Sequence, residues 1–195
     1  VSKLYGNFDR VLAPSQVMAD KLIGLGVKNV FVQPLGVDLH TFNPAVRDPG
    51  LRAELGIAED TRLLIFAGRG SKEKNLPVLL GCMKRLGPRY HLLLVGSSMP
   101  AVVPDNVTVV DEFCPATQVA RLMASADALL HAGDQETFGL VILEAMASGI
   151  PVVAVAAGAF QEIVTDQCGL LCAPNNPLAM ANAVRELFSH DSAAL

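Results

Sequence analysis

Short apolar runs recur along the whole chain and alternate with segments of helical periodicity. Eight of these runs are short enough to be strands, and most are continuously apolar rather than alternating. A strand that is apolar at successive positions is buried on both faces, as in a parallel sheet covered by helices. The predicted strands are residues 11–13, 30–32, 63–66, 91–95, 107–110, 128–130, 152–155 and 169–172.

Helical periodicity fills the segments between these runs. The alternation of strands and helices predicts an α/β fold, a Rossmann-like, doubly wound parallel sheet, and we assign residues 1–195 to one such domain. Ligands of such sheets bind beyond the carboxyl ends of the strands, where the strand order reverses. The predicted helices are residues 16–23, 76–86, 117–124, 140–148, 161–164 and 177–188.

Composition narrows the class of protein. A chain of 195 residues that is 51% hydrophobic and 17% charged can bury one substantial core. Its net charge of -4 and scattered basic residues indicate no nucleic-acid partner. No apolar run approaches eighteen residues and no signal peptide precedes the first strand, so we expect a cytoplasmic location. The four cysteines have no neighbouring histidine, and no metal site is predicted.

The segment from Glu136 to Pro151 carries the clearest chemical signal. Its pattern predicts a loop after a strand, followed by a helix that ends at Gly149. Free backbone N–H groups and the positive end of the helix dipole at the start of this helix suit a diphosphate. Glu136 precedes the helix and Glu144 lies about two turns inside it, so both can accept hydrogen bonds from one sugar nucleotide. The predicted site residues here are Glu136, Thr137, Phe138, Gly139, Leu140 and Glu144.

A second candidate loop follows the predicted strand 63–66. It runs from Gly68 to Asn75 and contains three cations. Arg69 offers a planar donor fork and Lys74 a point charge, and both are suited to the negative charge of a diphosphate leaving group. We therefore place Gly68, Arg69 and Lys74 in the same predicted site.

The two loops together resemble a known family. Glu136 and Glu144, with seven residues between them, resemble the signature of the retaining, nucleotide-sugar-dependent glycosyltransferases that include bacterial glycogen synthase and many lipid mannosyltransferases. The intervening Thr-Phe-Gly-Leu and the following Ala-Met-Ala-Ser-Gly-Ile-Pro also match, and Arg69 and Lys74 match the family's phosphate-binding loop. The resemblance implies the carboxyl-terminal, donor-binding domain of a GT-B enzyme whose amino-terminal acceptor domain is absent from this chain.

The resemblance also implies roles for single residues. Arg69 and Lys74 would stabilise the leaving diphosphate, Glu136 would face the transferred sugar, and Glu144 would hold the ribose hydroxyls. These enzymes generally need no metal and no cofactor. Further positions that match the family's nucleotide-lining elements are Gly36, Gly96, Val109 and Phe113.

The resemblance suggests a substrate without fixing it. The stretch from His131 to Gly139 looks closest to GDP-mannose-dependent α-mannosyltransferases, which favours mannose over a UDP-linked hexose, with a lipid or saccharide acceptor. His131 itself is interpreted as a structural residue. The full-length enzyme could meet the inner face of a membrane through its missing half. A GT-B epimerase, a phosphorylase and a non-catalytic nucleotide-sugar-binding module remain alternatives.

Overall fold

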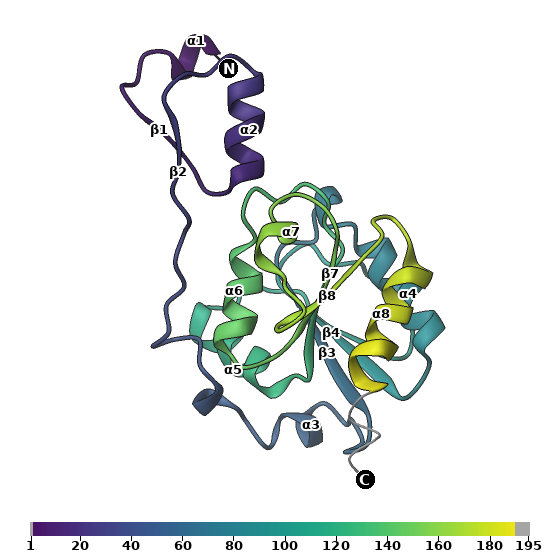
Figure 1. The fold of residues 1–195 in the computed structure, drawn as a ribbon. Helices are drawn as coiled ribbons and strands as arrows, with labels where there is room; N and C mark the ends of the chain where they lie inside the picture. Colours follow the sequence, from purple (N-terminus) through teal and green to yellow (C-terminus); the bar gives the residue numbers. More distant parts are fainter. Residues whose placement is uncertain (1, 190–195) are drawn as a thin grey trace.

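A computed structural model of the protein describes residues 2–189 (Figure 1). A six-stranded sheet with helices on both faces forms the main part, and a small lobe precedes it. The lobe contains α1 (Ser2–Tyr5), β1 (Val11–Ala13), α2 (Gln16–Gly24) and β2 (Val30–Val32). The main part contains η1 (Pro44–Val46), α3 (Leu51–Glu54), β3 (Arg62–Ala67), η2 (Lys72–Lys74), α4 (Leu76–Leu86), β4 (Tyr90–Val95), β5 (Val107–Val110), α5 (Ala116–Ser125), β6 (Ala128–His131), α6 (Leu140–Ala147), β7 (Val152–Val155), α7 (Phe160–Ile163), β8 (Gly169–Cys172) and α8 (Pro177–Ser189).

The six-stranded sheet is parallel and doubly wound, as predicted. Its order is β5-β4-β3-β6-β7-β8, so the chain moves outward from β3 to β5 and then returns to begin the other half at β6. Helices α4 and α8 lie on one face of the sheet, and α5 and α6 lie on the other (Figure 1). The strand order reverses between β3 and β6, where the carboxyl ends of these two strands leave a crevice.

The continuously apolar runs form the centre of the sheet because both faces are covered. Residues 63–66 of β3 and residues 92–94 of β4 are fully buried, and β7 is buried along its whole length. Burying one such side chain contributes about 1.5–3 kcal/mol. Helix α4 has the bounds that the sequence predicts, and β6 extends one residue further, to His131.

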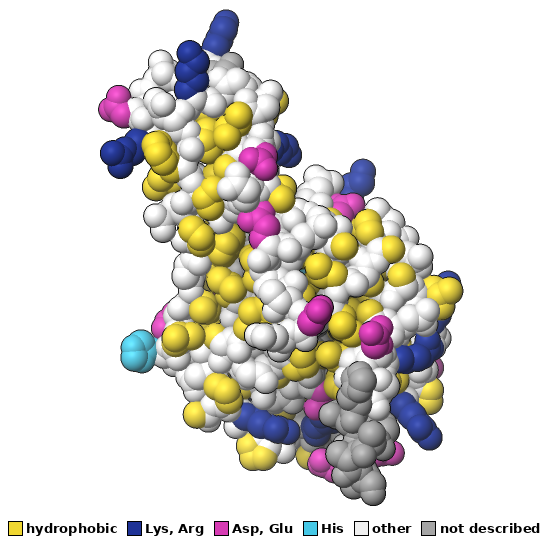
Figure 2. Space-filling model, in the orientation of Figure 1, with side chains coloured by type: hydrophobic (Ala, Val, Ile, Leu, Met, Phe, Trp, Pro, Cys, Tyr) yellow, Lys and Arg dark blue, Asp and Glu magenta, His cyan; other side chains and the backbone are white. Residues whose placement is uncertain are grey.

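The first two strands lie outside this sheet. β1 and β2 form a separate two-stranded parallel sheet and do not join the single parallel sheet that the sequence pattern predicted. Residues 33–43 contain no helix or strand and carry the chain away from the lobe. Leu12 and Phe31 are register partners that remain 62% and 51% exposed, and hydrophobic side chains gather on the lobe's surface (Figure 2).

Two polar contacts fix the lobe to the main part. The Ser15 hydroxyl donates to the Thr137 carbonyl oxygen over 2.9 Å. The Glu162 carboxylate accepts the backbone N–H groups of Gln16 and Val17 over 2.8 and 2.7 Å. A carboxylate at a helix N-terminus is favourable, so α2 is held at its first turn. Within residues 2–189, none of the helices is long and apolar enough to cross a membrane.

Candidate functional site

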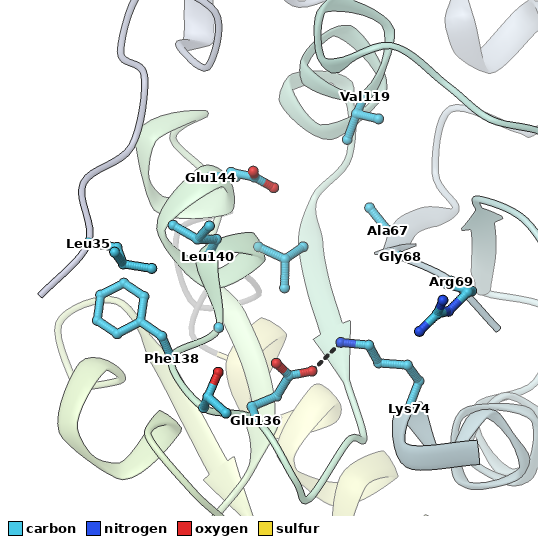
Figure 3. Close-up of a pocket in the computed structure, with 13 residues that line it drawn as sticks. Leu35, Ala67, Gly68, Arg69, Lys74, Val119, Glu136, Phe138, Leu140 and Glu144 are labelled. Atoms are coloured by element: carbon cyan, nitrogen blue, oxygen red, sulfur yellow. Dashed lines mark hydrogen bonds and ion pairs between the residues drawn. The ribbon is translucent and has the colours of Figure 1, made fainter. Parts of the chain in front are cut away.

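A cavity of about 440 Å³ opens at the carboxyl ends of β3 and β6, where the strand order reverses (Figure 3). One wall comes from the loop after β3 and from η2, and the other comes from the loop after β6 and from α6. The cavity brings together nine of the thirteen predicted site residues. They are Gly68, Arg69, Lys74, Glu136, Thr137, Phe138, Gly139, Leu140 and Glu144.

Opposite charges meet across this cavity. The Lys74 ammonium from η2 forms an ion pair with Oε1 of Glu136, drawn as a dashed line in Figure 3. The two side chains are only 21% and 16% exposed, so solvent screens this pair less than a surface pair. Arg69 is far more exposed, at 70%, and lies 3.9 Å from Glu73. The wall after β3 therefore presents an exposed cation, Arg69, at the rim and a partly buried cation, Lys74, deeper inside.

Glu144 lies on α6 and its carboxylate points into the same cavity (Figure 3). Burial raises the pKa of the Glu144 carboxyl. None of the described residues hydrogen-bonds to this carboxylate, although it is half-buried. A half-buried acceptor without a protein partner suits a ligand that donates hydroxyl hydrogens.

The start of α6 supplies the remaining polar groups. The first N–H groups of a helix have no partner inside the helix, and they point along its axis toward the preceding loop. Gly139 is the N-cap residue and has a φ of 87°. A Cβ at this position would lie 2.4 Å from Cε1 of Phe160, so only glycine fits. Gly139 and Leu140, at the start of the helix, both line the cavity.

The family model for glycosyl transferases group 1 matches residues 48–194 of this chain. This match covers most of the chain and includes every wall of the cavity except the segment around Leu35. The chain belongs to the glycosyl transferases group 1 family.

Individual relatives agree with this assignment. A GDP-mannose-dependent alpha-(1-6)-phosphatidylinositol dimannoside mannosyltransferase of Mycobacterium tuberculosis is 33% identical over 196 residues, which cover 94% of this chain and 50% of that protein. A D-inositol 3-phosphate glycosyltransferase of Xylanimonas cellulosilytica is 32% identical over 206 residues, which cover 94% of this chain and 49% of that protein. The chain spans about half the length of these curated relatives.

The comparison with solved structures supports the predicted fold class. The crystal structure of Anabaena HepE in complex with UDP and glucose matches with a TM-score of 0.86 and 25% sequence identity. The match covers 98% of this chain and 57% of that chain. The six-stranded domain of this glycosyl transferases group 1 member therefore has the fold seen in GT-B glycosyltransferases.

Four predicted site residues lie outside the lining of the cavity. Gly36 follows Leu35, which does line it. Gly96 has a φ of 131°, and a Cβ there would lie 2.1 Å from the Gly68 carbonyl oxygen, so it supports the lining loop from behind. Val109 packs against the core from β5, and Phe113 is 88% exposed. Their roles at the nucleotide remain predictions.

Four residues that line the cavity were not predicted from the sequence. Leu35, Ala67, Val119 and Val141 add apolar surface to the cavity. Leu35, Ala67 and Val141 directly adjoin the predicted residues Gly36, Gly68 and Leu140, and this adjacency was a usable signal. Val119 lies on α5, and nothing in its local sequence marks it as a lining residue. Residues 2–189 contain no group of three or more His, Cys, Asp or Glu side chains placed to hold a metal ion.

We expect Glu144→Gln to stabilise the unliganded protein at neutral pH. Because burial raises the pKa of this carboxyl in the fold, its charged form costs stability above the raised pKa, and this cost disappears as the pH falls below the unfolded pKa. The gain from the substitution should therefore shrink at acidic pH. Thermal unfolding at neutral pH and at acidic pH measures this gain in stability. Glu186→Gln, on the exposed face of α8, is the control. An equal gain in both variants would contradict the argument.

Proposed function

We propose that this chain is the donor-binding, carboxyl-terminal domain of a retaining glycosyltransferase, and that the cavity between β3 and β6 binds a nucleoside diphosphate sugar. The observation that carries the proposal is the arrangement inside one cavity: two cations on one wall, and two carboxylates and a helix N-terminus on the other. Cations and free amides match a diphosphate, and carboxylates match the hydroxyl groups on either side of it.

Each polar residue has one role in the proposed reaction. The bond between the anomeric carbon and the diphosphate oxygen breaks, and an acceptor hydroxyl forms the new bond on the same face of the sugar and passes its proton to the departing diphosphate oxygen. Arg69 and Lys74 offset the charge that grows on the leaving diphosphate, helped by the amides at the start of α6. Glu144 accepts from the ribose hydroxyls, and Glu136 faces the transferred sugar. Because two side-chain cations serve the diphosphate, the reaction needs no divalent metal ion and no cofactor.

We propose mannose from GDP-mannose as the donor. The Mycobacterium tuberculosis relative named above is GDP-mannose-dependent, which supports this choice. Anabaena HepE has been seen with UDP and glucose, which makes UDP-glucose the matched alternative. The acceptor, a lipid or a saccharide, is proposed to be held by the other half of the enzyme, which would work in the cytoplasm and could meet the inner face of a membrane through that half.

Calorimetric titration in EDTA tests the proposal. We expect GDP and GDP-mannose to bind the chain without added cation, and GDP-mannose to bind more tightly than UDP-glucose. Binding that appears only with Mg²⁺ or Mn²⁺ would remove the role given to Arg69 and Lys74, and no binding of either nucleotide would overturn the function. Product analysis with labelled donor and full-length enzyme distinguishes glycosyl transfer from epimerisation, from phosphorolysis and from binding alone.

A further inference from the structure

His131 is the last residue of β6 and its side chain is fully buried beside the cavity. The backbone N–H of Gly133 donates to its Nδ1 over 3.1 Å. An imidazole nitrogen that accepts a hydrogen bond carries no proton, so in the neutral ring the proton sits on Nε2. The structure therefore assigns one tautomer to His131, with Nε2 as the donor.

The ring is held in one orientation by its neighbours. Phe160 packs edge-on against it with a centroid separation of 4.9 Å, and Phe66 lies tilted on it at 5.6 Å. Burial, and after it the charge of Lys74, lowers the pKa of His131 to about 3. The imidazole is therefore neutral through the physiological range, and it can donate a hydrogen bond without adding a charge.

The Nε2 atom faces Glu136. It lies 3.5 Å from Oε1, the same oxygen that holds Lys74, and it has no hydrogen-bond partner within residues 2–189. A buried donor left without a partner is unfavourable, and a shift of roughly half an ångström would bring this pair to normal hydrogen-bond length. The other charged group that faces the ring is Lys74, from η2.

We infer that His131 is a positioning residue for Glu136: its Nε2–H takes over as the carboxylate's hydrogen-bond donor when a diphosphate draws Lys74 away. This inference rests on the proposed function. In the unliganded protein Lys74 is paired with Glu136. An anionic diphosphate competes for the same ammonium, and Glu136 would then keep no cation. A neutral N–H that donates to Oε1 helps to keep the carboxylate ionised and holds it in place for the sugar.

Substitutions at His131 test this role through the difference between two ligands. His131→Phe keeps an aromatic ring and removes the donor, and His131→Gln keeps an N–H group near the position of Nε2. We expect His131→Phe to weaken GDP-mannose binding roughly tenfold or more and GDP binding by a clearly smaller factor, because either diphosphate draws Lys74 away but only the sugar also contacts Glu136. His131→Gln should recover most of the loss.

A double substitution separates this role from a structural one. In a Glu136→Gln background, His131→Phe should cause no further loss of GDP-mannose affinity. An equal loss for GDP and GDP-mannose, or a loss that persists without the Glu136 carboxylate, would overturn the inference.

The ring's protonation can be read without any ligand. In protein labelled with ¹⁵N at histidine, the neutral Nε2-protonated form of His131 should be seen, and its Nε2 signal should shift in Glu136→Gln. A proton on Nδ1, or a signal indifferent to Glu136, would overturn the inference. This readout remains available if the chain binds no nucleotide, a result that would reject the proposed function instead.

Discussion

Lys74→Met is expected to destabilise the unliganded protein by about 2–4 kcal/mol, somewhat below the range for fully buried ion pairs. The substitution leaves the Glu136 carboxylate, whose side chain is only 16% exposed, without its cation. The free energy of unfolding from urea titration measures this loss. The same variant should bind GDP at least tenfold more weakly, because a charged hydrogen-bond donor to the diphosphate is removed.

Two further variants make this expectation specific. Lys72→Met changes an exposed lysine in the same short helix and should alter stability by less than about 0.5 kcal/mol. Glu136→Gln combined with Lys74→Met removes both charges and should recover most of the lost stability, because no uncompensated carboxylate remains. The recovery should not extend to GDP binding. A double variant as unstable as Lys74→Met would show that the ion pair is not the cause.

The parts of the fold that the sequence predicted are those set by local pattern. The continuous apolar run of β3 and the helical spacing of α4 each specify an element within a few residues, and the position of Gly139 marks the start of α6. The reversal of strand order between β3 and β6 then places the loops after these strands in one crevice. Nine site residues could be found because they sit in those two loops or in the helices that follow them.

The remainder depends on contacts between distant parts of the chain. Lys74 and Glu136 are 62 positions apart in sequence, and nothing local indicates that one pairs with the other in the unliganded state. Likewise, the apolar runs of β1 and β2 look like any others, and only their pairing with each other separates them from the main sheet. His131 was interpreted as structural, and its hydrogen bond from Gly133 agrees, but the approach of Nε2 to Glu136 is visible only in three dimensions.

Gly139→Ala should lower both the stability of the fold and the affinity for GDP. The residue has a φ of 87°, a conformation that costs an L-residue about 1–2 kcal/mol. The new Cβ would also lie 2.4 Å from Cε1 of Phe160, and forced overpacking adds about 1–3 kcal/mol. The Phe160 ring, which packs on His131, or the start of α6 must then move. Urea titration and calorimetry with GDP should both report the change.

Gly56→Ala provides the matched control for this last expectation. Gly56 follows α3 with a φ of 66° and has no atom within 4 Å of an added Cβ, so its substitution carries the cost of backbone conformation alone. The difference in unfolding free energy between the two variants is therefore the cost of the clash with Phe160. Adding Phe160→Leu to Gly139→Ala should reduce that difference and restore part of the GDP affinity, because the ring no longer displaces the amides at the start of α6. Equal effects of the two alanine substitutions on stability and on GDP binding would mean that the helix start tolerates displacement, and the diphosphate would have to be held by Arg69 and Lys74 alone.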